Sequence, residues 1–188
     1  MNPLTLARDL ADRLEALGVP YAIGGALALG HHTAPRGTKD VDINVFLDAS
    51  EVRWVLEALA EAGYEVDLER ALEQARERGD VALWHDDIRV DLFVDSIPLH
   101  AHARSRRLSL PIAGRPAWVL SAEDLVLFKM LFDRSKDWVD VEHVLAARRE
   151  TFETGYVRRQ LVDHVGEEDH RVARFDRLRE DFLEGGEA

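Results

Sequence analysis

The sequence predicts an α+β fold, in which helices flank a mixed, mostly antiparallel sheet and a C-terminal helical region follows. Three observations support this. A short apolar run over residues 19–23 leads through two glycines to an alternating strand over 39–46. Two pairs of short strands follow, and from residue 121 to about 183 apolar residues recur at helical spacing. We expect a core over residues 1–120 with a helical region, residues 121–188, packed on it.

The N-terminal half alternates helices with single strands. The first helix is predicted to begin after Asn2, a good capping residue, with Pro3 in its first turn, and to end at Gly18. A strand over 19–23, a small helix over 26–32 and a loop over 33–38 follow. Beyond the strand over 39–46, we expect a helix over 51–62, a weak strand over 64–68 and a charged helix over 69–78.

The C-terminal half is predicted to contain two strand pairs and then helices. The strands cover residues 81–84 and 88–94, joined by a tight turn, and residues 106–112 and 115–120, joined around Ala113-Gly114. Ser121 then caps a helix, with Asp124 three residues later. The four tryptophans are expected in the core or at an interface, and stacking of one of them on a base stays open.

Composition narrows the classes of function. The chain has no cysteine, which excludes a disulfide, a thiol nucleophile and a thiolate metal site, and a reducing cytoplasm is the expected location. Its net charge of −12 argues against holding long nucleic acid by bulk electrostatics, with local basic clusters at 104–107 and 129–136 as candidates for a basic cleft. No apolar run approaches the roughly 18 residues of a membrane span, and residues 1–12 do not resemble a basic leader, so we expect no membrane partner.

The strand over 39–46 carries a pair of carboxylates. Asp40 and Asp42 are two residues apart, so both project from the same face of the strand and favour a cation between them. Oxygen ligands suit Mg²⁺ or Mn²⁺. Asp91, inside the apolar strand over 88–94, is the candidate for a third carboxylate, with Asp95 as its alternative.

Each of these signals has a plainer explanation. An Asp-x-Asp pair also occurs on solvated edge strands, and alternation of Arg89, Asp91 and Phe93 also describes the wet face of a half-buried strand. A histidine metal site is not expected, because the chain has no His-x-x-x-His pair and the adjacent His31 and His32 point apart.

The glycine pair Gly24-Gly25 stands where a strand ends and a helix begins. Backbone N–H groups at a helix N-terminus form a cradle for phosphate. The plainer interpretation is a strand–helix turn that needs a positive φ.

These pieces together resemble a known superfamily. A strand that ends in two glycines, a short helix and an Asp-x-Asp strand are similar to the DNA polymerase β-like nucleotidyltransferases. The form of the segment, Arg36-Gly37-Thr38-Lys39-Asp40-Val41-Asp42, looks most like the AbiEii and MenA-type nucleotidyltransferase toxins. A later helix with Lys129, followed by the pattern Lys136-Asp137 … Asp140, also resembles that branch. The resemblance covers ordered pieces between about residues 19 and 144.

The resemblance implies a role for each matching residue. Gly24 and Gly25 would contact a triphosphate through their amides, while Asp40 and Asp42 would hold the metal ions. Asp91 would be the third metal ligand and a base toward the acceptor. The remaining roles fall to cations: Lys129 and Lys136 at the β and γ phosphates, and Arg36 and Lys39 at the edge of the cleft. Asp137 and Asp140 are alternatively anchors for the lysines rather than metal ligands.

The implied function is Mg²⁺- or Mn²⁺-dependent transfer of a nucleoside monophosphate from an NTP to an acceptor hydroxyl. The acceptor is expected to be an RNA or tRNA end, a protein, or a small molecule such as an aminoglycoside, and acidity slightly favours a cationic one. A toxin role with an antitoxin protein as partner is one expectation. The alternatives are a catalytically inactive nucleotide- or partner-binding module on the same fold, and an unrelated α+β protein.

Overall fold

The computed structural model describes residues 1–184, which divide into two compact units. The first unit holds residues 1–28 and 36–120, and the second holds residues 29–35 and the chain from Ser121 onward. The sequence placed residues 29–35 with the first 120 residues, whereas the structure groups them with the helical unit.

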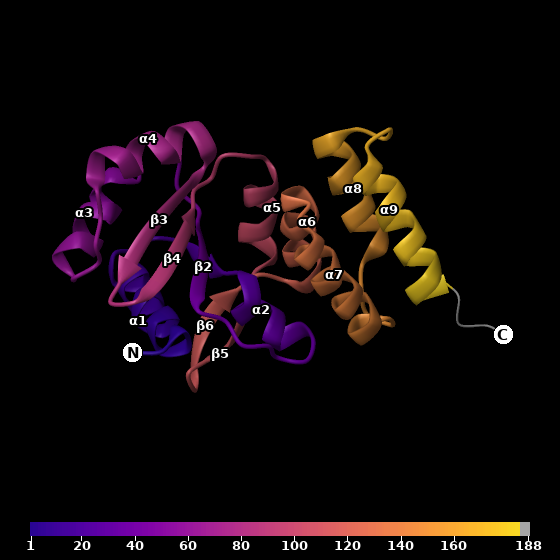
Figure 1. Cartoon of the computed structure of the whole chain (residues 1–188), viewed down its shortest axis with the longest axis horizontal. Helices are drawn as coiled ribbons and strands as arrows, with labels where there is room; N and C mark the ends of the chain where they lie inside the picture. The colour runs from indigo at the N-terminus through magenta and orange to yellow at the C-terminus, as the bar shows by residue number, and fades with distance from the viewer. Residues whose placement is uncertain (185–188) are drawn as a thin grey trace. The chain divides into compact units, whose positions relative to one another are not determined.

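A six-stranded sheet forms the centre of the first unit (Figure 1). Its order is β3-β4-β2-β1-β6-β5. Two pairs of neighbours, β2 with β4 and β1 with β6, are parallel, and the other three pairs are antiparallel. The predicted α+β class with a mixed, mostly antiparallel sheet is therefore confirmed. The strands are β1 (Tyr21–Ile23), β2 (Asp40–Val45), β3 (Asp80–His85), β4 (Ile88–Phe93), β5 (Leu108–Ile112) and β6 (Arg115–Val119).

In the longer helices of the first unit, apolar residues at helical spacing lie on one face of the helix, and this face is buried. Helix α1 (Pro3–Ala16) begins at Asn2, whose side chain accepts the N–H of Thr5 at 2.9 Å, as its capping chemistry predicts. Its fully buried Leu6, Leu10 and Leu14 lie on the helix that packs against β1, β2, β5 and β6. Helix α3 (Arg53–Glu61) contacts α4 (Leu68–Arg78), which in turn packs on β3.

Two predicted elements of this unit differ from the structure. The weak strand over 64–68 is reduced to one bridge between Glu65 and Trp84, after which Asp67 caps α4. Helix α5 (Leu99–Arg106) was not predicted, and it takes the start of the segment expected to be a strand over 106–112. Its buried residues are Leu99, His100 and Ala103, so its sequence shows no apolar stripe that periodicity can detect.

The second unit is helical throughout most of its described length. Helix α6 (Ala122–Phe132) begins at Ser121, whose hydroxyl accepts the N–H of Asp124 at 3.1 Å, as predicted. Residues 122–130 are all buried, and α6 packs on α7 (Ser135–Arg148) and α8 (Thr154–Val165). Helix α9 (His170–Arg179) and a π-helical turn, η1 (Glu180–Glu184), follow. Across residues 1–184 no helix is both long and apolar enough to cross a membrane.

Of the four tryptophans, which the sequence placed in the core or at an interface, one lies in the core. Trp138 is 1% exposed and donates its indole N–H to Asp133. Trp54, Trp84 and Trp118 are instead 44%, 44% and 38% exposed, so they are not core residues.

Candidate active site

The three predicted carboxylates belong to two neighbouring strands of the first unit. Asp40 and Asp42 lie on β2, and the parallel register pairs Asp42 directly with Asp91 on β4. Residues paired in register, and residues two apart on one strand, point to the same face of a sheet. The opposite face of β2 carries Val41 and Ile43, both fully buried. The fold therefore brings all three carboxylates to one face, which is half-buried at these positions.

The surroundings of Asp91 shift the pKa of its carboxyl group. Its side chain is 15% exposed, and burial raises the pKa of its carboxyl group. The Arg89 guanidinium opposes this, since it donates to Asp91 Oδ1 from Nη2 at 2.6 Å and from Nε at 2.9 Å. The nearby charges of Asp40 and Asp80 raise the pKa further. The site is thus a place where negative charge is crowded.

The side chains do not converge on one ion as they stand. Among residues 1–184, no group of three or more histidine, aspartate or glutamate side chains is placed to hold a metal. The carboxylates already have other partners: Arg89 binds Asp91, and the Thr38 hydroxyl donates to Asp40 Oδ1. The donor set nevertheless fits Mg²⁺ or Mn²⁺ in kind, because it is made of carboxylate oxygens held in strand register.

Gly25 brings backbone against this carboxylate face. It begins helix α2 (Gly25–His32) with φ +54°, a conformation that side chains rarely adopt. A Cβ at this position would lie 1.8 Å from Asp42 Oδ2 and 2.8 Å from Asp42 Cβ. Only glycine allows the helix start to approach Asp42 so closely. The positive φ of the plainer interpretation is therefore present at Gly25, and the phosphate-cradle interpretation stays a prediction.

Gly24 has a different part. Its N–H donates to the backbone carbonyl of Asp42 at 2.9 Å, which joins the turn to the sheet. Its own carbonyl accepts the N–H of Ala28 at 3.0 Å and so makes the first hydrogen bond of α2. The amide of Gly24 is thus already bonded. The next three amides at the helix start, those of Gly25, Ala26 and Leu27, precede the first intrahelical hydrogen bond.

The cations proposed from the sequence lie in three settings. Arg36 and Lys39 are exposed in the segment before β2. Lys136 is exposed in the first turn of α7. Lys129 is 5% exposed within the helical unit, where its Nζ lies 2.6 Å from Asp140 Oδ2 and 3.5 Å from Asp137 Oδ1. Asp137 and Asp140 therefore do anchor Lys129, which was the alternative to metal binding for these two carboxylates.

Sequence reasoning missed the part played by Arg89. Its i, i+2 spacing from Asp91 on a strand places both side chains on one face, which was the available signal for this ion pair. The register that sets Arg89 opposite Asp40 and Ala82 opposite Asp91 joins segments distant in the chain, so it had no local signal.

Comparison with known proteins identifies the fold. No protein-family model matches the chain, and no curated protein matches its sequence. The solution structure of antibiotic-resistance factor ANT(2'')-Ia matches with TM-score 0.59 and 14% identity, over 95% of this chain and 97% of that one. Its crystal structure with adenylyl-2''-tobramycin matches with TM-score 0.50 and 17% identity, over 95% of each chain.

The lincosamide antibiotic adenylyltransferase LnuA, lincomycin-bound, matches with TM-score 0.50 and 19% identity, over 71% of this chain and 90% of that one. At such identities the likeness establishes the fold alone. The chain has the polymerase β-like nucleotidyltransferase fold, as the sequence resemblance predicted. The narrower resemblance to AbiEii and MenA toxins has no support from these structures.

Proposed function

We propose that the protein transfers a nucleoside monophosphate from an NTP to the hydroxyl of an acceptor. One observation carries the proposal: three carboxylates from β2 and β4 share a sheet face beside Gly25, whose backbone lies against Asp42. This is the combination that the chemistry requires, because transfer depends on positioning and on charge neutralisation at the phosphates.

In the proposed reaction, groups of this site bind the phosphates and accept the proton of the acceptor hydroxyl. The acceptor oxygen attacks the α-phosphorus, the bond from the α-phosphorus to the bridging oxygen breaks, and pyrophosphate leaves. The acceptor proton passes to a carboxylate, for which Asp91 is the candidate because it lies on β4 in register with Asp42. The amides of Gly25 and Ala26 at the start of α2 would bind phosphate oxygens. We keep Arg36, Lys39 and Lys136 as candidate phosphate-binding cations.

Asp40, Asp42 and Asp91 would hold Mg²⁺ or Mn²⁺, which would neutralise charge on the phosphates and polarise the acceptor oxygen. Lys129 is the weakest of the proposed phosphate ligands, since Asp137 and Asp140 already neutralise it. Thr38 supports Asp40 from the preceding loop through its hydroxyl.

A small-molecule acceptor is the variant of this proposal with most support. The solved structures that share the fold include one with adenylyl-2''-tobramycin and one bound to lincomycin. The net charge of −12 also favours a neutral or cationic acceptor over RNA. A toxin acting on tRNA or protein would need the same carboxylates and differs only in its acceptor.

Label transfer tests the proposal. The protein is incubated with each α-³²P-labelled NTP, Mg²⁺ and one acceptor at a time: tobramycin, lincomycin, bulk tRNA, or the protein itself. We expect label on one acceptor, and loss of that label in Asp40→Asn and Asp42→Asn. Asp87→Asn removes an exposed turn carboxylate and should transfer label at the wild-type rate.

Two results would count against the proposal. Label transfer that survives in Asp40→Asn and Asp42→Asn would place the chemistry elsewhere. NTP binding that needs these residues, with no transfer to any acceptor, would instead favour the nucleotide-binding module on the same fold.

A further inference from the structure

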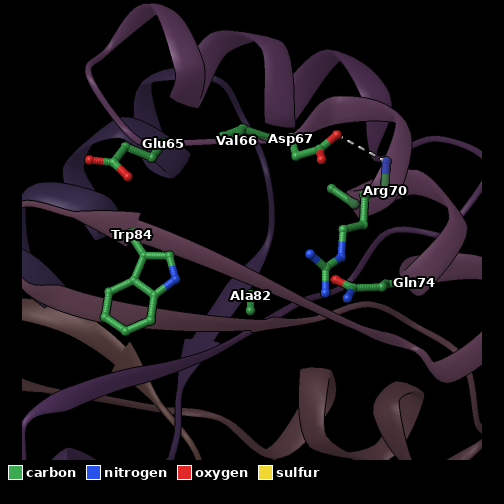
Figure 2. A pocket seen from close by; sticks show the side chains of 8 residues that line it. Glu65, Val66, Asp67, Arg70, Gln74, Ala82 and Trp84 are labelled. Atoms are coloured by element: carbon green, nitrogen blue, oxygen red, sulfur yellow. Dashed lines mark hydrogen bonds between the residues drawn. The ribbon is translucent and has the colours of Figure 1, made fainter.

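A pocket of about 590 Å³ opens in the first unit beside the edge strand β3 (Figure 2). Its volume lies within the range of small-molecule sites. The floor is Ala82 on β3, and the walls come from the segment before α4 and from the first turns of that helix. Its lining includes Glu65, Asp67, Arg70, Gln74, Ala82 and Trp84.

The pocket floor lies on the same sheet face as the carboxylates. Ala82 is paired in register with Asp91, and Asp91 is paired with Asp42. The N–H of Gly24 in turn bonds to the carbonyl of Asp42. These positions form one row across the sheet, from the glycine turn to the pocket. Neighbouring strands are about 4.8 Å apart, so Ala82 lies about two strand spacings from Asp42.

The direction of this row matters for the proposed reaction. In phosphoryl transfer the attacking and leaving oxygens lie roughly in line on opposite sides of the phosphorus. The phosphates of the NTP would be held at the start of α2, at the Gly25 end of the row. The attacking hydroxyl then has to arrive from the opposite end, where β4 and β3 lie.

The lining has the chemistry of a site for a hydroxylated ring. The Trp84 indole is 44% exposed and stands at one side of the floor, while Arg70 and Gln74 extend from α4 at the other side (Figure 2). Asp67 caps α4 by accepting the backbone N–H of Arg70 at 3.4 Å. Within residues 1–184, the Arg70 guanidinium has no ion-pair partner, and Glu65 is fixed by its backbone bridge to Trp84.

An indole face accepts the apolar face of a ring, and planar donors and acceptors around it bind groups at the ring edge. We propose that this pocket is the acceptor subsite and that the acceptor is a polyhydroxylated ring, as in a sugar or an aminocyclitol. Trp84 stacks on the ring, Arg70 and Gln74 donate to its hydroxyls, and Glu65 accepts from them. The inference rests on the proposed function, whose acceptor it specifies.

Fluorine NMR tests the subsite without requiring turnover. The full chain is labelled with 5-fluorotryptophan, which gives one resonance for each of the four tryptophans. Trp84→Phe assigns the Trp84 resonance, and Trp54, which is also 44% exposed, is the matched control on α3. Tobramycin and maltose, a cationic and a neutral polyhydroxylated ring compound, are titrated with Mg²⁺ and a non-hydrolysable ATP analogue present.

We expect at least one of the two probes to shift the Trp84 resonance and to leave that of Trp54 in place. Gln74→Ala should weaken this binding about tenfold, as expected for loss of a hydrogen bond to a buried partner. No shift at Trp84 with either probe, or equal shifts at Trp84 and Trp54, would overturn the subsite. A shift caused only by the trinucleotide CCA would overturn the ligand class and favour an RNA end.

Ala82→Leu provides a second variant, because it fills the pocket floor and removes no polar group. Once an acceptor is found, this variant should raise the acceptor KM about tenfold or more and leave the NTP KM unchanged. Trp54→Ala should change neither value. Label transfer together with an unmoved Trp84 would refute the subsite alone. A Trp84 shift without label transfer would refute the proposed function and leave the pocket as a ring-binding site that is not an acceptor subsite.

Discussion

At the scale of single residues, Asp91 is a proposed metal ligand whose buried charge destabilises the folded protein. An ionised carboxylate that is mostly buried beside Asp40 and Asp80 is held in place by one guanidinium, that of Arg89. Its raised pKa means that the folded protein holds the Asp91 proton more tightly than the unfolded chain does. The contribution of this group to folding is therefore most favourable at acid pH and is lost as pH rises through its folded pKa.

Asp91→Asn should accordingly raise the thermal unfolding midpoint near pH 7 in metal-free buffer, because the amide keeps a hydrogen bond to Arg89 and carries no charge. The gain should shrink as pH is lowered toward the ordinary pKa of aspartate. Circular dichroism melts at several pH values measure both effects, with Asp87→Asn as an exposed control. A variant that is less stable than the wild type at pH 7 would show that the Arg89 ion pair outweighs the burial of charge.

At the scale of elements, the turn between β1 and α2 fixes the distance between a helix N-terminus and β2. Gly18 and Gly25 both have positive φ, +70° and +54°. A Cβ at Gly18 meets nothing within 4 Å, whereas a Cβ at Gly25 would overlap Asp42. The two glycines therefore separate the cost of the backbone conformation from the cost of the close approach.

Gly18→Ala should destabilise the fold by about 1–2 kcal/mol, the conformational cost alone. Gly25→Ala should cost more, since Asp42 has to move, and it should also weaken NTP binding in the presence of Mn²⁺. Chemical denaturation gives the stabilities, and isothermal titration with a non-hydrolysable ATP analogue gives the affinities. Equal losses of stability, with unchanged nucleotide binding in Gly25→Ala, would contradict the role assigned to this turn.

Among the helices and strands, those with a local sequence pattern were predictable. The alternation in β2 and the leucine spacing in α1 are local patterns, and the structure contains both elements. Helix α6 and its Ser121 cap were predicted for the same reason. Helix α5 lacked a stripe, and Lys129 could not be judged because residues 122–130 of α6 are buried around the whole helix and leave no polar side.

At the scale of the whole molecule, the sequence predicted the residue types of the site and left their arrangement open. The pairing of Asp42 with Asp91 and of Asp91 with Ala82 depends on strand register between distant segments, which no local pattern encodes. The pocket beside β3 likewise combines side chains from the segment around the Glu65–Trp84 bridge, a charged helix and an edge strand. The grouping of the three carboxylates therefore depends on the assembled sheet and cannot be predicted from the Asp-x-Asp motif alone.

The binding of Mn²⁺ tests the central claim most directly. Electron paramagnetic resonance follows free Mn²⁺ during titration of the protein with a non-hydrolysable ATP analogue present. The carboxylate face of β2 and β4 predicts Mn²⁺ binding in the wild type and in Asp87→Asn. It predicts severe loss of that binding in Asp40→Asn, Asp42→Asn and Asp91→Asn. Equal Mn²⁺ affinity in all five proteins would contradict the assignment of these three carboxylates as the metal site.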